Sequence, residues 1–336
     1  MHAQRNTFVR VFTLVAVIVS AFVVLSAEPR TLRLVSTAWP PFTNDTGQPR
    51  FALDLVEAAF SRIGVTSTTA IVPAPQFTSA LMSGAFDGSG AAWKDPQREA
   101  ALIFSDPYLE NRLVLVGRRG SDVSATSLTS LGGKRIAIVA GYSYGDAAQK
   151  SGPAFVRTQT EEESVSRLLG GSADYTLMDE LVVRYITSNY AAQAREKLAI
   201  GTMPLVVRPL HLALRKDAPD AAGIIARFNS QLRGMIADHT YHRLLHVDWI
   251  RADIDGDGVP EYVPSNDKLG SSQPQSAYVV STAAMSKGAP ASEPRFYIGG
   301  NIYRDWASVP ESYKSTANDG HDDPRRSMGS VFTFHW

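Results

Sequence analysis

The stretch that decides the fold runs from residue 87 to residue 108 and reads Asp87-Gly88-Ser89-Gly90-Ala91-Ala92-Trp93-Lys94-Asp95-Pro96-Gln97-Arg98-Glu99-Ala100-Ala101-Leu102-Ile103-Phe104-Ser105-Asp106-Pro107-Tyr108. Small residues lead to Trp93, and a single arginine, Arg98, stands before the Phe-Ser-Asp-Pro-Tyr run. A guanidinium offers two parallel donors and therefore suits a planar carboxylate. Taken alone, Arg98 is better explained as a charge on a helix surface, so the segments around it must decide its role.

Segments of alternating type lie on both sides of this stretch. Apolar–polar alternation and short apolar runs predict strands, while apolar residues three and four apart predict helices. The predicted strands are Thr31–Ser36, Ser67–Val72, Arg112–Gly117, Arg135–Val139, Asp174–Met178 and His211–Arg215. The predicted helices are Phe51–Ile63, Gln76–Ser83, Glu161–Leu169, Glu180–Ser188, Asp220–Ile236 and His239–Val247. This alternation predicts an α/β protein with mostly parallel sheets.

The composition excludes several classes of protein. The 336 residues carry a formal net charge of zero, so a broad nucleic-acid-binding surface is not indicated. The chain has no cysteine, which rules out disulfides, thiolate zinc sites, cysteine nucleophiles and a lipidated N-terminal cysteine. The sequence also lacks a glycine-rich phosphate loop, a nucleophile elbow and a zincin motif.

The N-terminus predicts export. Arg5 and Arg10 precede an apolar run from Val11 to Ala27, and this order is typical of a secretory signal. We expect cleavage after Ala27. The alternative is an uncleaved membrane anchor, because the run is near the lower length limit for spanning a bilayer. Both alternatives place the rest of the chain outside the cytoplasm, in the periplasm.

Four further segments, taken in order with residues 87–108, resemble the family-3 extracellular solute-binding proteins, the periplasmic amino-acid receptors of ABC importers. The segments are Trp39-Pro40-Pro41-Phe42, Phe51–Ala58, Leu131–Tyr144 and Ala173–Glu180. The resemblance covers Thr31–Ile250 and implies an α/β fold that is two-lobed and periplasmic-binding-protein-like (type II), with a ligand cleft between the lobes. It implies that residues 28–118 and 211–250 form lobe 1 and that residues 119–210 form lobe 2.

The resemblance also implies which residues hold the ligand. Trp39 would stack on it, Arg98 would grip its α-carboxylate with help from Ser143, and Asp179 would receive its α-ammonium. A base in one lobe and an acid in the other would favour closure on a dipolar solute. Plainer alternatives exist: a core tryptophan, a helix-surface arginine, and N-caps of the helices that follow Ser143 and Asp179.

Two positions depart from the family pattern, which often has hydroxyl residues there. Trp93 cannot replace a hydroxyl, and Asp95 would repel an anion unless it caps a helix. The backbone N–H groups near Gly90 and Ala91 could bind a carboxylate instead, and Tyr142 is a further candidate contact. The solute is therefore left open between an amino acid and another small organic acid.

We expect a monomeric binding protein, not an enzyme, that captures a small amino-acid-like ligand by hinge closure and passes it to a membrane ABC permease without a required cofactor. One alternative is an enzyme of the same fold, similar to the periplasmic cyclohexadienyl dehydratases. It would need an acid–base group such as Glu180 or Glu99 inside the cleft. The other alternative is a ligand sensor or scaffold module whose C-terminal part binds a partner protein.

Residues 251–264 contain a second motif, Asp253-Ile-Asp255-Gly-Asp257-Gly-Val259-Pro-Glu261. Acidic residues at alternate positions on a tight glycine turn are typical of short calcium loops, and the Val259 carbonyl could add a ligand. We therefore predict a structural Ca²⁺ held by these five residues. The alternative is a solvated acidic turn.

The C-terminal extension, residues 265–336, has a different composition. Ser265–Pro294 is rich in small and polar residues and is predicted to be a flexible linker. Residues 295–314 form an aromatic island in which Gly299-Gly300 suggests a hairpin turn. Upstream, His239, His242 and His246 are spaced along one helical face; such histidines can bind zinc, but a surface helix is the better explanation.

Overall fold

The structure is a computed structural model that describes residues 31–145, 152–189, 196–266, 269, 273–274, 277–280 and 294–314. The signal or anchor predicted at residues 1–27 lies outside these residues, and so does most of the helix expected after Ser143. Every helix among the described residues is too short or too polar to cross a membrane.

A nine-stranded mixed sheet organises the chain, in the order β2-β1-β3-β9-β5-β8-β6-β7 with β4 beside β9. The strands are β1 Thr31–Thr37, β2 Thr66–Val72, β3 Gly88–Trp93, β4 Leu102–Phe104, β5 Leu109–Arg118, β6 Arg135–Val139, β7 Ala154–Thr158, β8 Tyr175–Asp179 and β9 Leu198–Arg215. Pairing is parallel within β2-β1-β3 and within β8-β6-β7. It is antiparallel wherever β5 or β9 takes part, so the sheet is less parallel than the sequence predicts.

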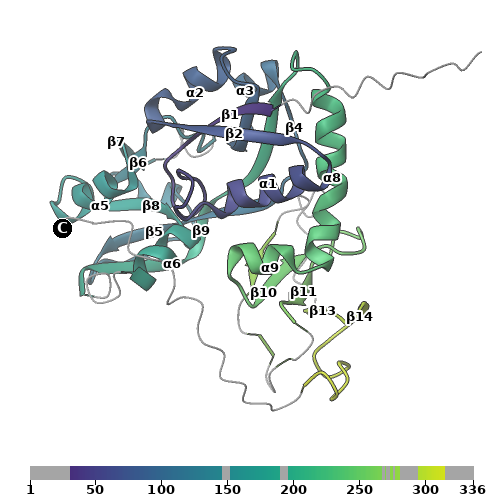
Figure 1. Cartoon of the computed structure of the whole chain (residues 1–336). Helices are drawn as coiled ribbons and strands as arrows, with labels where there is room; N and C mark the ends of the chain where they lie inside the picture. The colour runs from purple at the N-terminus through teal and green to yellow at the C-terminus, as the bar shows by residue number, and fades with distance from the viewer. Residues whose placement is uncertain are drawn as a thin grey trace, which may run out of the picture.

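Strands β5 and β9 join the two parallel halves (Figure 1). The 18 residues of β9 pair with β5 over their first part and with β3 and β4 over their last part. Only the C-terminal part of β9, His211–Arg215, was predicted as a strand. The remaining residues escape the prediction because Pro204 and Pro209 interrupt their alternation.

Helices cover both halves (Figure 1). They are α1 Phe51–Arg62, α2 Ala74–Met82, α3 Pro96–Ala101, α5 Glu161–Leu169, α6 Glu180–Asn189, α8 Ala221–Ala237 and α9 Thr240–Leu245, with a short 3-10 helix at Thr129–Leu131. The predicted apolar face of α1 is buried, and Phe60 packs edge-on against Phe228 of α8 with ring centroids 6.1 Å apart. Burying such faces supplies most of the stability of short helices.

The chain beyond the first sheet forms a second, five-stranded sheet in the order β12-β10-β11-β13-β14. Its strands are β10 Trp249–Ala252, β11 Glu261–Pro264, β12 Tyr278–Val279, β13 Arg295–Ile298 and β14 Asn301–Tyr303. The predicted hairpin turn at Gly299-Gly300 is confirmed: β13 and β14 pair antiparallel, and both glycines have positive φ. Around Phe296, the rings of Trp249, Tyr262 and Trp306 form a small aromatic core.

The described part of Ser265–Pro294 differs from the predicted flexible linker. Leu269, Tyr278 and Val280 are buried, and β12 pairs with β10. The Tyr278 hydroxyl donates to the Glu110 carbonyl oxygen at 3.2 Å, so the extension touches strand β5, which links the two halves. The polar composition of the segment conceals these single buried side chains.

Candidate functional site

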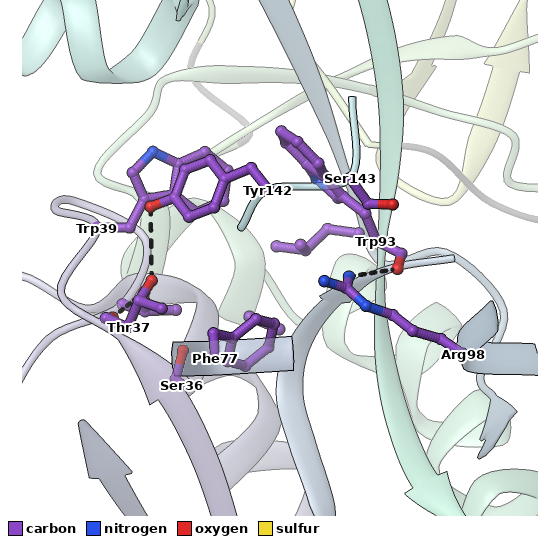
Figure 2. A pocket seen from close by; sticks show the side chains of 11 residues that line it. Ser36, Thr37, Trp39, Phe77, Trp93, Arg98, Tyr142 and Ser143 are labelled. Carbon is purple, nitrogen blue, oxygen red and sulfur yellow. Dashed lines mark hydrogen bonds between the residues drawn. The ribbon is translucent and has the colours of Figure 1, made fainter. Parts of the chain in front are cut away.

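A small cavity lies between the two halves of the first sheet, where β1, β3, α2 and the segment after β6 meet (Figure 2). It measures about 30 Å³, which is room for one or two waters. An amino acid would fit only if the walls moved apart. The lining residues are Ser36, Thr37, Trp39, Thr43, Phe77, Ala91, Trp93, Arg98, Tyr142, Ser143 and Leu210.

Aromatic side chains fill most of the space around this cavity. Trp39 contacts Trp93 and Tyr142 with ring centroids 5.6 and 5.4 Å apart. Tyr144 contacts Trp93 and Tyr142 at 5.6 and 6.2 Å. We call Trp39, Trp93, Tyr142 and Tyr144 the aromatic cluster. It joins both halves, since Trp39 and Trp93 follow or end strands of one half and the tyrosines follow β6 of the other.

Arg98 lies at one end of the cluster and is almost fully buried. Its guanidinium donates to the Trp93 carbonyl oxygen at 2.8 Å and to the Thr78 hydroxyl at 2.9 Å, and its Nε lies 3.3 Å from an Asp95 oxygen. Burial lowers the pKa of Arg98, and the Asp95 carboxylate opposes this effect. The positive charge that the resemblance assigns to a ligand carboxylate is thus already paired within the protein.

The contacts of Asp95 explain why an acid stands at this position, where the family pattern often has a hydroxyl residue. It caps α3 by accepting a hydrogen bond from the Arg98 backbone N–H at 2.9 Å, as its position before Pro96 suggested. Its other oxygen accepts a 2.5 Å bond from the Ser143 hydroxyl. Ser143 belongs to the other half of the sheet, so this bond bridges the two halves.

Asp179 lies at the end of β8 and is 2 % exposed. Its carboxylate accepts from the Asn111 amide at 3.1 Å and from the backbone N–H groups of Arg112 and Leu181 at 3.0 and 2.7 Å. Burial raises the pKa of Asp179 to about 7 although these donors oppose the rise. The residue therefore caps α6, as the plainer alternative held, and is also a buried carboxylate beside the cleft.

Glu161, the first residue of α5, is a carboxyl beside the aromatic cluster that sequence reasoning did not single out. Burial raises the pKa of its carboxyl to about 8, the Asp179 carboxylate adds to the rise, and the Trp39 indole N–H partly offsets it. Glu161 Oε2 and Trp39 Nε1 are both buried; they lie close enough to interact, but neither makes a well-formed hydrogen bond with a described residue. In Figure 2 the indole nitrogen of Trp39 points away from Arg98. Glu161 thus lies on the Trp39 side of the aromatic cluster, and Asp179 is connected to Trp93 through Asn111.

The structure brings most of the predicted ligand residues to the cavity wall: Trp39, Ala91, Trp93, Arg98, Tyr142 and Ser143. Gly90 and Asp179 are not on that wall; Gly90 uses its carbonyl oxygen to accept the Tyr108 hydroxyl. Besides Glu161, the sequence reasoning missed Asn111, whose side chain links Trp93 Nε1, at 2.7 Å, to Asp179. Nothing in the strand pattern marked Asn111, because it stands between Glu110 and Arg112, just before the predicted strand Arg112–Gly117.

The predicted calcium loop connects β10 to β11. Carboxylate oxygens of Asp253, Asp255 and Glu261 lie within 4.8 Å of one another. The guanidinium of Arg295 sits against the loop and donates to Glu261, to Asp257 at 2.7 Å and to the Val259 carbonyl oxygen at 3.2 Å. Calcium binding by these residues stays a prediction. The guanidinium of Arg295 already contacts most of the residues that a calcium ion would use.

Of the three histidines of the predicted helical face, His239 and His242 are in contact, with ring centroids 5.4 Å apart, and only His242 lies within α9. His242 is buried and its Nε2 lies 2.9 Å from the Val263 carbonyl oxygen. His239 and His246 flank α9 with positive φ, outside the helix itself. The arrangement fits a helix end packed on the second sheet.

Comparison with known proteins identifies the family. The model of the bacterial extracellular solute-binding proteins, family 3, matches residues 33–251, which covers the whole first sheet and its helices. The chain belongs to this family. Accordingly, the two halves are the lobes of a type II periplasmic-binding-protein fold with a cleft between them, followed by the C-terminal extension.

Two curated proteins are similar to this family-3 protein. One is the putative ABC transporter arginine-binding protein 2 of Escherichia coli (strain K12), 27 % identical over 137 residues, which are 37 % of this chain and 52 % of that protein. The other is the virulence sensor protein BvgS of Bordetella pertussis, 27 % identical over 157 residues, 46 % of this chain and 12 % of that protein. The chain therefore spans about half the length of the first relative and a small part of the second.

Solved structures have the same fold. An ancestral arginine-binding protein bound to arginine is 25 % identical with a TM-score of 0.54, covering 65 % of this chain and 98 % of that chain. The ligand-binding core of GluR0 from Nostoc punctiforme in complex with L-glutamate is 22 % identical with a TM-score of 0.53, covering 63 % and 96 %. These neighbours are amino-acid-binding proteins, and the part of this chain that they match is about two thirds of its length.

Proposed function

We propose that this family-3 protein acts in the periplasm and captures a small amino-acid-like solute by hinge closure, for delivery to an ABC permease. The observation that supports this most is a cavity whose walls come from both lobes. Hydrogen bonds bridge the lobes at its rim, among them Ser143 to Asp95, Arg98 to the Gly141 carbonyl oxygen at 3.5 Å, and Thr37 to Tyr142 at 3.5 Å.

Hinge motion follows from how the lobes are joined. The links are β5 and β9, which pair with each other through register irregularities near Val114 and Val116. A few linking residues that absorb backbone rotation are sufficient for domain closure. A solute that contacts both walls stabilises the closed arrangement by its differential affinity for it. The small cavity is consistent with lobes that must part to admit the solute.

The test measures binding and closure together. The purified protein is screened by thermal unfolding against the common amino acids and small organic acids, because a ligand of the native state alone must raise the midpoint. Any solute that does so is then followed by small-angle X-ray scattering, and we expect a smaller radius of gyration. Ala91→Leu, which fills the cavity wall, should abolish the response, whereas Ala70→Leu on the exposed edge of β2 should not. If no solute in the panel binds, the proposal is wrong.

A catalytic function is the second candidate, and one observation favours it. The pKa values of Glu161 and Asp179, about 8 and about 7, place two carboxyl groups near neutrality, as acid–base catalysis requires. The glutamates first considered are ion-paired helix charges: Glu180 with Arg112 and Arg184, and Glu99 with Lys94. Turnover of prephenate or arogenate that is lost in Glu161→Gln would establish an enzyme and replace the transport proposal.

A further inference from the structure

Glu161 and Asp179 form an acidic recess in lobe 2 that has no ion-paired counter-charge within the part of the chain that the structure describes. Arg112 pairs with Glu110 and Glu180, and Arg98 pairs with Asp95. Arg157 acts electrostatically on Tyr144 but makes no ion pair with either carboxyl. Among the described residues, neither Glu161 nor Asp179 makes an ion pair. Burying carboxylates without a partner is costly, so such a pair persists where a function requires it.

The aromatic cluster borders this recess and brings the faces of aromatic rings close to its carboxyls. Trp39 contacts the Glu161 end through its indole N–H, and the Glu161 carboxylate acts electrostatically on Tyr142 and Tyr144. Faces of Trp and Tyr attract cations, with the largest effect where water is excluded. Four aromatic rings beside two carboxylates are therefore the components of a site for an organic cation.

The opposite end of the cleft is less suited to an anion than the family resemblance implies. The positive charge of Arg98 is neutralised by Asp95, and the Ser143 hydroxyl is already donated to Asp95. Arg208, the other arginine near this end, lies over the Trp93 ring at 5.9 Å and donates to the Lys94 carbonyl oxygen. The groups beside the cleft that lack an internal counter-charge are thus carboxyls, and a bound cation would stabilise their ionised form.

We infer that Glu161 is a ligand-binding residue and that, with Asp179, it selects a solute with a net positive charge, carried by an ammonium, alkylated ammonium or guanidinium group, over molecules of the same shape with no net charge. The inference rests on the proposed function and narrows its solute class. When the lobes part, the aromatic side chains that now fill the cleft admit the cation, and Glu161 Oε2 and Trp39 Nε1 become available to the ligand.

The experiment compares cations with their neutral counterparts by calorimetry on the purified protein. The pairs are arginine and citrulline, lysine and norleucine, and choline and 3,3-dimethylbutanol. We expect the cation of at least one pair to bind at least about 30-fold more tightly, since a buried charge pair lost on one side costs about 2 kcal/mol or more. In Glu161→Gln this ratio should fall at least about tenfold.

Glu162→Gln is the matched control, because it removes the same charge from the next position of α5; its ratio should stay that of the wild type. Asp179→Asn is a second variant that should also lower the ratio. Equal binding of a cation and its counterpart, an unchanged ratio in Glu161→Gln, or no binding of any cation would each overturn the inference. If a neutral amino acid closes the lobes and binds as tightly as its cationic counterpart, the inference is wrong while the proposed function stands.

Discussion

The loop between β10 and β11 and the recess in lobe 2 are both acidic, but their charges are balanced in different ways. In the loop, Glu261 is fully buried and the guanidinium of Arg295 pairs with it. In the recess, Glu161 and Asp179 meet only neutral donors among the described residues. A carboxylate that the chain neutralises itself contributes to the fold, whereas one left without a cation is available to a ligand.

The difference arises from topology. Glu261 and Arg295 are direct neighbours in the parallel ladder of β11 and β13, so the second sheet brings a cation to the loop whenever it forms. Asp179 and Glu161 instead lie where β8 and the segment after β7 lead into helices, at the carboxyl ends of strands that pair parallel with β6. Ligands of α/β folds bind at this edge, beyond the carboxyl ends of parallel strands.

The largest effect is expected when Arg295, the cation that balances the acidic loop, is removed. Arg295→Met keeps the apolar stem but leaves Glu261 buried and unpaired, and we expect the free energy of unfolding to fall by about 3 kcal/mol. Urea denaturation at neutral pH measures it. Arg304→Met is the control, because Arg304 is 88 % exposed in its pair with Asp305.

The same variant tests the calcium prediction. With Arg295 gone, the oxygens of Asp253, Asp255 and Glu261 remain within 4.8 Å of one another, a spacing suited to a hard cation. Calcium should then stabilise Arg295→Met more than the wild type. If calcium stabilises neither protein, the loop is an acidic turn closed by arginine, and if Arg295→Met is as stable as the wild type, the loop carbonyls and backbone donors suffice without it.

A substitution in the recess should affect ligand binding more than the free energy of unfolding. Asp179→Asn is expected to weaken binding of a cationic solute by at least about 30-fold, or 2 kcal/mol, while changing the free energy of unfolding by less than about 1 kcal/mol. Relief of a buried charge offsets the poorer cap of α6. Isothermal calorimetry and urea denaturation give the two quantities, with Glu180→Gln as the control. Loss of stability comparable to that of Arg295→Met would make Asp179 a structural residue.

How much of this could be predicted depends on how each residue is marked in the sequence. The bounds of α5 and β6 match the prediction because their apolar spacing is regular. Trp39, Arg98 and Ser143 were found through ordered motifs. Glu161 was not, because it opens a run of three glutamates at a helix N-terminus, where acids favour the helix dipole and need no other explanation. Only the fold distinguishes the glutamate that faces the cleft.

Arg295 was missed for a related reason. It lies 34 residues beyond Glu261 in the chain, across a segment whose composition predicts a linker. Its pairing depends on the register of β11 and β13, and short strands carry too little pattern to reveal their neighbours. Long-range charge balance is therefore the part of this site that sequence reasoning could not supply.

The recess also predicts a pH dependence. Since the pKa of Glu161 is raised to about 8 in the native state, that state holds more protons than the unfolded chain, and stability falls as the pH rises toward and through 8. Glu161→Gln should match the wild type near pH 5 and exceed it at pH 9 by on the order of 1–2 kcal/mol, because partial exposure limits the effect. Asp179, Tyr142, Tyr144 and the Trp39 indole face this carboxyl.

Urea denaturation at several pH values gives the two curves, and their difference isolates Glu161. Titration of His211 and His242, whose pKa values burial lowers to about 4, affects both proteins alike. Glu162→Gln should not reproduce the divergence. Parallel curves for Glu161→Gln and the wild type would mean that water or another group already stabilises the charge, and the contrast with the loop would weaken.

The smallest expected effect concerns Asp95, an acid beside the cleft that is balanced internally, by Arg98 and by Ser143. Ser143→Ala removes the 2.5 Å bond to Asp95, which joins the lobes and is lost when they part. We expect a solute to bind about three- to tenfold more weakly, because a typical hydrogen bond contributes about 0.5–1.5 kcal/mol. Ser130→Ala, which removes only a local bond to the Ser127 carbonyl oxygen, should bind normally. If Ser143→Ala instead binds an acidic solute more tightly than the wild type does, then Asp95 and Ser143 block an anion site at Arg98, and selection against anions belongs to this pair as well as to the recess.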